Sequence, residues 1–227
     1  MIWILLAAVI LAAIAGPGLW ARNTLDKYSG HVESLPGTGG ELARHLLDRH
    51  GLMYVRVEPT DSADHYDPVA KAVRLTERVM RGKSLTAVAV AAHEVGHALQ
   101  DHSGFRPLKA RTRLVKVAAQ VEKTGALFML AIPLALAAAR SPRAGLVMFL
   151  IGLASMGLST LIHVVTLPVE WDASFGRALP ALRDGAHITE KEDAAVRKVL
   201  RACAMTYVAS SLSSLLNFWR WIAVLRR

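Results

Sequence analysis

Hydrophobic and polar residues divide this chain into alternating apolar and polar blocks. Residues 1–20 are almost wholly apolar, and residues 21–123 form a largely polar block. Two further apolar runs follow at residues 126–139 and 144–167, with a short basic turn at residues 140–143 between them. A helix needs about 20 apolar residues to cross a bilayer. The pattern therefore predicts membrane segments on both sides of the polar block.

The first apolar run has two interpretations, an uncleaved membrane anchor over residues 1–20 or a cleaved signal peptide. No basic residue precedes the run, and no clear cleavage site of small residues follows it. Arg22 and Lys27 lie directly after it, which is typical of the cytoplasmic end of a membrane segment. These features favour an anchor.

The two later runs predict a transmembrane helical hairpin over residues 124–167, as opposed to a buried hairpin in a soluble protein. The first run is short, but its helix spans a bilayer if it starts near Val117 and keeps Glu122 and Lys123 at the interface. Basic residues gather before the hairpin and are fewer in its turn. This bias predicts that the polar block is cytoplasmic.

Within the polar block, periodicity predicts a mainly helical domain with a small β-hairpin or short sheet. Residues 41–49 form an amphipathic pattern, and residues 52–57 and 72–75 are β-type runs that we expect to pair as a hairpin. Ser84 is placed to cap a helix over residues 85–100. That helix starts with a segment that is apolar on nearly every face, which predicts that it is buried.

The C-terminal part, residues 168–227, is amphipathic. Thr189 and Glu192 match a capping box at a helix start. From there to Val224 polar and apolar residues fall on opposite stripes, so this segment is expected to pack on the protein or lie at the membrane interface, with a further crossing as the alternative. The expected domains are an anchor, a catalytic region, a hairpin and a C-terminal region, at residues 1–20, 21–123, 124–167 and 168–227.

Composition narrows the class of protein. Hydrophobic residues make up 53% of the chain, which is high for a soluble domain, and the formal net charge is +9. Basic residues flank the apolar runs and aromatic residues make up only 6%, so a lipid bilayer is the expected partner and nucleic acid is not. The single cysteine, Cys203, excludes an internal disulfide.

The run His93-Glu94-Val95-Gly96-His97 carries the clearest chemistry. On a helix, His93 and His97 are one turn apart and point the same way, so one zinc ion can bind a nitrogen from each at about 2.0–2.1 Å. Glu94 lies beside them and can deprotonate a water that zinc activates. The alternative is a histidine pair that decorates a helix, but burying these groups without a metal would be costly. The motif predicts one zinc ion.

A catalytic zinc has three protein ligands and one open position. We favour Glu170 as the third ligand, because it ends an uncharged stretch in which a carboxylate is costly unless it is paired or bound to metal. The other candidates are Asp67, Asp101, His102, His163, Asp172 and His187.

Several stretches of the chain match one known family in order: His65-Tyr66-Asp67-Pro68, Val73-Arg74-Leu75, and residues 90–98, 166–174 and 200–208. From about residue 30 to residue 210, the chain resembles the YugP-like membrane-associated neutral zinc metallopeptidases. The resemblance implies a zinc-dependent endopeptidase with a zincin-like fold. It also implies His93, His97 and Glu170 as zinc ligands and Glu94 as the catalytic base.

One departure concerns the residues that orient the ligands. Other zinc peptidases with a glutamate ligand often have an aspartate four residues after it, directed at a zinc-bound histidine. Here Ser174 stands at that position and the nearby acid is Asp172. Either residue is a candidate for orienting a ligand.

A zinc peptidase also needs a donor for the developing oxyanion. His65, Tyr66 and Tyr207 are the candidates, although each is also explained by turn shape or packing. The strand near residues 73–75 could bind an extended peptide by edge pairing.

The predicted function is membrane-associated zinc-dependent peptide hydrolysis, with peptides or proteins, including membrane proteins, as substrates. His93 and Glu170 must share one side of the membrane, which two crossings between them permit. We expect an integral protein of the plasma (inner) membrane with its catalytic region in the cytoplasm. The alternative is a non-catalytic membrane scaffold or chaperone with a structural zinc ion, which would show a closed shell of four ligands.

Overall fold

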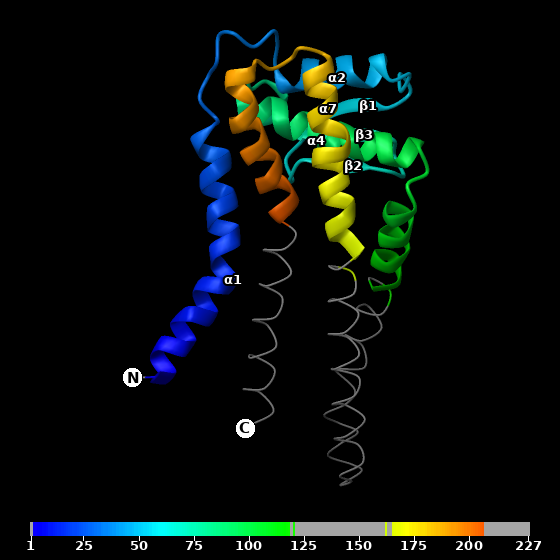
Figure 1. Cartoon of the computed structure of the whole chain (residues 1–227). Helices are drawn as coiled ribbons and strands as arrows, with labels where there is room; N and C mark the ends of the chain where they lie inside the picture. The colour runs from blue at the N-terminus through cyan, green and yellow to red at the C-terminus, as the bar shows by residue number, and fades with distance from the viewer. Residues whose placement is uncertain (1, 119, 121–161, 163–164, 207–227) are drawn as a thin grey trace. The chain divides into compact units, whose positions relative to one another are not determined.

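A computed structural model describes residues 2–118, 120, 162 and 165–206 of the chain (Figure 1). The chain forms two compact units, one of residues 1–105 and 167–227 and the other of residues 106–166. Residues 106–118 of the second unit are helical. The first unit holds the candidate site.

The first unit is mainly helical with a small sheet, as expected. Residues 167–171 and 190–206 are also helical. The helices and strands with their bounds are α1 (Ile2–Lys27), α2 (Gly39–Arg49), β1 (Arg56–Thr60), β2 (His65–Asp67), β3 (Ala72–Thr76), α3 (Glu77–Met80), α4 (Leu85–His102), the π-helix η1 (Asp172–Ala178) and α7 (Leu179–Asp184).

The sheet has the order β1-β3-β2, and this corrects the predicted hairpin. Strand β1 runs parallel to β3, with Arg56 opposite Ala72. The expected hairpin between residues 52–57 and 72–75 is therefore wrong. The polar stretch between those runs contains the strand β2, which itself pairs antiparallel with β3. Since β3 has a neighbour on each side, it cannot bind a peptide by edge pairing.

The transmembrane hairpin expected at residues 124–167 is not supported. A membrane-spanning helix has to be both long and continuously apolar. Within the part of the chain that the structure describes, no helix combines the length and the apolar character needed to cross a membrane. Residues 124–161 and 163–164 of the expected hairpin, and residues 207–227, lie outside the described residues.

Two caps fix the helices that form the core. The Ser84 side chain accepts a hydrogen bond from the Ala87 amide at the start of α4, as the sequence predicts. Thr38 and Glu41 form a reciprocal capping box at the start of α2. Both arrangements satisfy backbone amides that have no partner within the helix.

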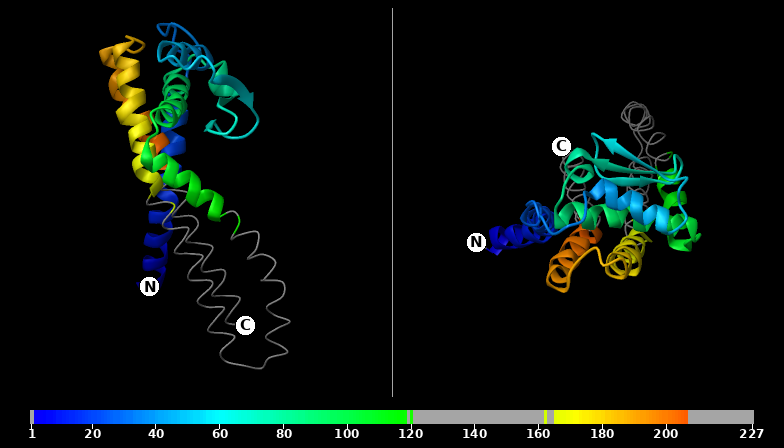
Figure 2. Two further views of the ribbon diagram at one scale, coloured as in Figure 1. Left: turned by 90° about the vertical axis from the view of Figure 1, so that its right-hand side faces the viewer. Right: turned by 90° about the horizontal axis from the view of Figure 1, so that it is seen from above.

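Helix α4 is the centre of the first unit. Figure 2 shows α4 between the sheet on one side and the segments 172–184 and 190–206 on the other. Every residue of α4 from Leu85 to Ala98 is buried, as its apolar sequence predicts.

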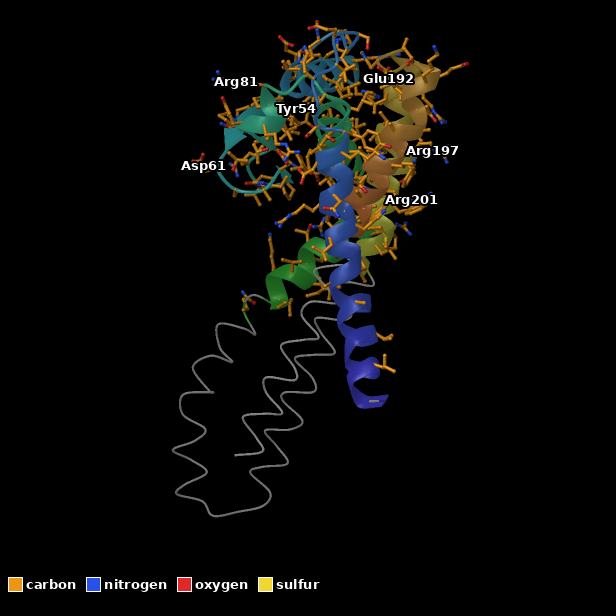
Figure 3. All side chains as sticks on the ribbon, turned by 90° about the vertical axis from the view of Figure 1, so that its left-hand side faces the viewer. Tyr54, Asp61, Arg81, Glu192, Arg197 and Arg201 are labelled. Atoms are coloured by element: carbon orange, nitrogen blue, oxygen red, sulfur yellow. The ribbon has the colours of Figure 1, made fainter. Side chains whose placement is uncertain are left out.

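The helix of residues 190–206 has an exposed face, from which Arg197 and Arg201 project outward (Figure 3).

Gly96 sets how closely α4 approaches η1. A Cβ atom added at Gly96 would lie 2.5 Å from the carbonyl oxygen of Ala173, and such overlap forces backbones apart. We expect Gly96→Ala to destabilise the protein by about 1–3 kcal/mol, measured by urea unfolding. Gly16→Ala in α1 is the matched control, because nothing lies within 4 Å of its added Cβ. Equal stability of Gly96→Ala and wild type would show that this approach is not tight.

Candidate metal centre

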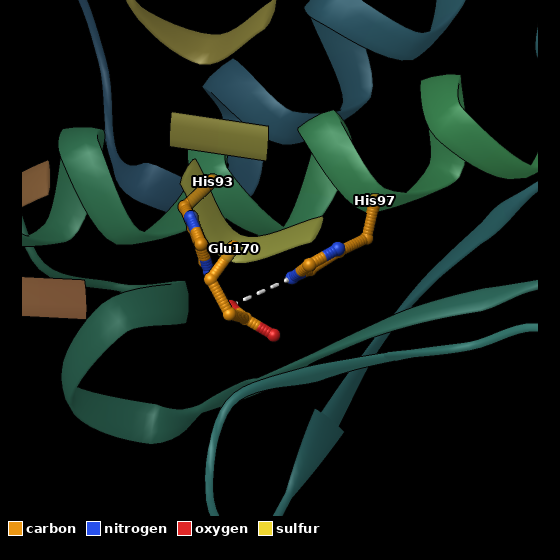
Figure 4. A group of neighbouring side chains, drawn as sticks. All are labelled: His93, His97 and Glu170. Carbon is orange, nitrogen blue, oxygen red and sulfur yellow. Dashed lines mark ion pairs between the residues drawn. The ribbon is translucent and has the colours of Figure 1, made fainter. Parts of the chain in front are cut away.

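Three buried side chains from two distant parts of the sequence meet below α4. The imidazoles of His93 and His97 leave α4 on the same face, and Glu170 extends its carboxylate between them (Figure 4). The Oε2 atom of Glu170 lies 3.2 Å from Nε2 of His93 and 3.3 Å from Nε2 of His97. Their three potential ligand atoms all lie within 4.8 Å of one another. Glu170 is fully buried, and both histidines are buried.

Ser174 fixes the tautomer of His93. The Ser174 hydroxyl donates to the carbonyl oxygen of Leu200 at 3.1 Å, and its oxygen lies 3.0 Å from Nδ1 of His93. With the hydroxyl proton used, Nδ1 of His93 must be the donor in this second bond. The Nε2 atom of His93 then carries the lone pair that faces Glu170. This is the arrangement that a metal ligand requires.

Gln100 holds His97 in the same way. Nδ1 of His97 lies 2.9 Å from Oε1 of Gln100, which can only accept. His97 therefore carries its proton on Nδ1 and directs the lone pair of Nε2 toward Glu170. Two lone pairs and a carboxylate oxygen facing one another at this distance repel unless a proton or a cation lies between them.

The geometry and the donor set fit zinc. Ligand atoms about 2.1 Å from a tetrahedral zinc ion lie about 3.4 Å apart, close to the 3.2 and 3.3 Å observed here. Two imidazole nitrogens and one carboxylate oxygen are common ligands of catalytic zinc, whereas calcium and magnesium prefer oxygen alone. His93, His97 and Glu170 are thus the residues that would hold the ion.

Electrostatics keep the Glu170 carboxylate ionised. Burial raises the pKa of Glu170, but the charge of His97 and hydrogen bonds from both histidines outweigh it and hold the pKa well below its usual range. Those bonds need a proton on Nε2, at the position that a bound cation would take. An ionised carboxylate is the form that binds a metal.

The π-helix η1 follows the segment that carries Glu170. π-Helical turns are rare and occur mostly at functional sites. Asp172 lies at its start, and its Oδ2 atom accepts hydrogen bonds from Nε2 of Gln100 and Nε of Arg177. Gly176 leaves room for Asp172, since a Cβ there would lie 2.6 Å from Oδ1 of Asp172. Ser174 contacts His93 directly, whereas Asp172 reaches His97 only through Gln100.

Glu94 is buried on α4 beside the two histidines. It shares this region with the buried thiol of Cys203. Burial first, and then the negative charges of Glu94 and Glu170, raise the pKa of Cys203 above its usual range. The thiol is therefore held in its protonated form.

The predicted oxyanion donors His65 and Tyr66 form hydrogen bonds with residues other than the three candidate ligands. Nδ1 of His65 is 2.8 Å from the carbonyl oxygen of Ala63, and the Tyr66 hydroxyl donates to Asp101 at 2.7 Å. Burial and this bond raise the pKa of Tyr66 above its usual range. Tyr207 lies outside the described residues.

The other candidates for the third ligand have different surroundings. Asp67 accepts from Arg74 and two backbone amides, His102 is near the Tyr54 hydroxyl, and His187 stacks edge-on against His45. His163 is outside the described residues. Within the described part of the chain, only His93, His97 and Glu170 converge as a possible metal site.

Gln100 and Cys203 belong to this region, and the sequence did not single them out as site residues. Gln100 falls in the last turns of α4, three residues after His97, which is the one local signal that links it to the site. Its other partners are 69 and 72 residues away. Only the folded chain brings them together.

The fold and the site define a mainly helical protein with a buried group of two histidines and one glutamate that could hold a metal ion. Residues 1–226 match a family model described as "Putative neutral zinc metallopeptidase", and the chain belongs to this family. It is similar to the "Putative membrane protease YugP" of Bacillus subtilis (strain 168), with 35% identity over 228 residues that cover 95% of each chain. No solved structure matches the chain.

Proposed function

We propose that this chain is a zinc-dependent endopeptidase that hydrolyses peptide bonds with a water that Glu94 deprotonates. The observation that carries the proposal is the convergence of His93, His97 and Glu170, with both histidine tautomers set for metal binding. Membership in a family of zinc metallopeptidases supports the same chemistry. A zinc ion bound there would act as a Lewis acid and lower the pKa of a bound water to about 7.

Glu94 has the position of the general base. It follows His93 on α4 and is buried, as a group that handles a proton away from bulk solvent should be. It would take a proton from the attacking water and then give it to the leaving amine. Tyr66 and His65 stay candidates for the oxyanion donor, and Tyr66 would first have to leave Asp101.

The substrate we propose is a peptide or a protein. The name of the Bacillus relative includes the word membrane, which supports the expectation that this chain acts at a membrane and that membrane proteins are among its substrates. The alternative function is a scaffold or chaperone with a structural zinc ion. Its closed shell would need a fourth protein ligand, and the described residues bring together three.

Removal of the metal tests the function. The purified full-length protein should cleave an unfolded protein substrate such as casein at neutral pH. Incubation with a zinc chelator should abolish cleavage, and one equivalent of zinc should restore it, measured by release of new amino termini. Cleavage that persists after complete removal of zinc would contradict the proposal. Stoichiometric zinc with no cleavage of any peptide would favour the scaffold.

A further inference from the structure

Gln100 is a fully buried polar side chain whose hydrogen-bonding groups all have partners. Its Oε1 atom lies 2.9 Å from Nδ1 of His97. Its Nε2 atom donates to the carbonyl oxygen of Val169 at 2.7 Å and to Oδ2 of Asp172 at 2.9 Å. Each buried polar group left without a partner would cost about 1–3 kcal/mol. Gln100 is therefore held in one orientation.

That orientation cannot be reversed. The Val169 carbonyl and the Asp172 carboxylate only accept hydrogen bonds, so the amide NH₂ of Gln100 must face them. Its oxygen must then face His97 and accept the Nδ1 proton. The choice of tautomer at His97 thus follows from the two acceptors on the other segment.

Gln100 also joins the two elements that carry the metal ligands. His97 lies on α4, whereas Val169 directly precedes Glu170 and Asp172 follows it by two residues. One side chain therefore ties the ring of His97 to the backbone next to Glu170. His93 has a different arrangement, since its partner Ser174 lies on η1 itself.

A closed circuit of hydrogen bonds supports Gln100. Arg177 donates from Nε to Asp172 at 2.8 Å and from Nη2 to the Ser103 hydroxyl at 3.1 Å. The Ser103 hydroxyl in turn donates to the backbone oxygen of Gln100 at 3.0 Å. The circuit fixes Asp172 and the end of α4 together. Shared, fully satisfied networks of this kind rigidify a site.

We infer that Gln100 is a positioning residue: acting with Asp172, it sets the tautomer of His97 and holds His97 at bonding distance from the ion shared with Glu170. This inference rests on the proposed zinc centre. It goes beyond that centre because part of the zinc affinity would depend on a residue that does not touch the metal. Partners that orient metal ligands typically contribute 10- to 100-fold in affinity.

The first test replaces Gln100 with methionine, which keeps the length of the side chain and removes its hydrogen bonds to His97, Val169 and Asp172. Zinc affinity is measured on the full-length protein by competition with a chromophoric chelator. We expect Gln100→Met to bind zinc about 10- to 100-fold more weakly than wild type. The control is Thr86→Val on the same helix, because Thr86 is also buried and its hydroxyl donates to the Leu25 carbonyl. Thr86→Val should lower the melting temperature of the metal-free protein and leave zinc affinity unchanged.

The second test compares Gln100→Glu with the double variant Gln100→Glu/Asp172→Asn, and it still applies if Gln100→Met does not fold. In Gln100→Glu the new carboxylate still accepts from His97, but it can no longer donate to Val169 and it faces the Asp172 carboxylate. Zinc affinity should fall. Adding Asp172→Asn removes the opposing charge and supplies an amide donor for the new carboxylate, at the expense of the Arg177 bond to Oδ2. The double variant should therefore bind zinc about tenfold more tightly than Gln100→Glu alone.

The outcomes separate this inference from the proposed function. Zinc affinity of Gln100→Met within twofold of wild type would overturn the inference, as would a double variant no tighter than Gln100→Glu. A wild-type protein that binds zinc in a Gln100-dependent way but cleaves no peptide would uphold the inference and reject the peptidase. A wild type that binds no zinc would overturn both.

Discussion

Glu94→Gln is expected to lower kcat/KM for peptide hydrolysis by about 10²- to 10⁴-fold while the protein keeps its zinc. The size of this decrease in kcat/KM is that expected for the loss of general base catalysis. The amide of glutamine has nearly the shape of the carboxylate but cannot take a proton from water. Because Glu94 is not among the three side chains that converge on the metal position, zinc stoichiometry should stay at that of wild type.

The measurement combines steady-state kinetics with metal analysis of the same preparation. Glu190→Gln is the matched control, since it makes the same chemical change at an exposed position. It should keep wild-type activity. Unimpaired cleavage by Glu94→Gln would exclude Glu94 as the base, and loss of zinc from this variant would mean that Glu94 binds the metal.

Glu170→Ala is expected to weaken zinc binding by more than about 100-fold and to remove activity with it. The variant keeps only the two histidine ligands on α4. Residues that merely orient a metal ligand contribute 10- to 100-fold to metal affinity, so loss of a ligand itself should cost more. The metal-free variant should still fold, because it loses a buried charge that is costly to keep. Chelator competition measures the affinity, and circular dichroism measures the fold.

The control for Glu170→Ala is Glu192→Ala. Glu192 accepts from the backbone amide of Thr189 at the start of the helix of residues 190–206, so its loss should lower stability without changing zinc affinity. If Glu170→Ala bound zinc as tightly as wild type, the third ligand would have to be another residue.

Local sequence signals predicted the elements that carry the site. Ser84 and the apolar run after it predict the start of α4 and its burial, and the spacing of His93 and His97 predicts that they share a face. These features depend on neighbours within a few residues. Glu170 could be suspected for a similar reason, because a carboxylate next to an uncharged stretch needs a partner.

Contacts between residues far apart in the chain could not be predicted from such local signals. Two short β-type runs do not specify the direction in which they pair: β1 pairs parallel with β3, and β2 pairs antiparallel with β3 on its other side. The sequence did not show which of Asp172 and Ser174 contacts a ligand. In the structure Ser174 contacts His93, and Asp172 contacts Gln100. Gln100 gave little local signal, since its amide contacts residues 69 and 72 positions away.

X-ray absorption at the zinc edge of the purified full-length protein identifies the atoms bound to the ion. We expect one zinc ion per chain with two imidazole nitrogens and oxygen donors, all at about 2.0–2.2 Å. A sulfur atom at about 2.3 Å would place Cys203 in the shell and contradict a centre made of His93, His97 and Glu170.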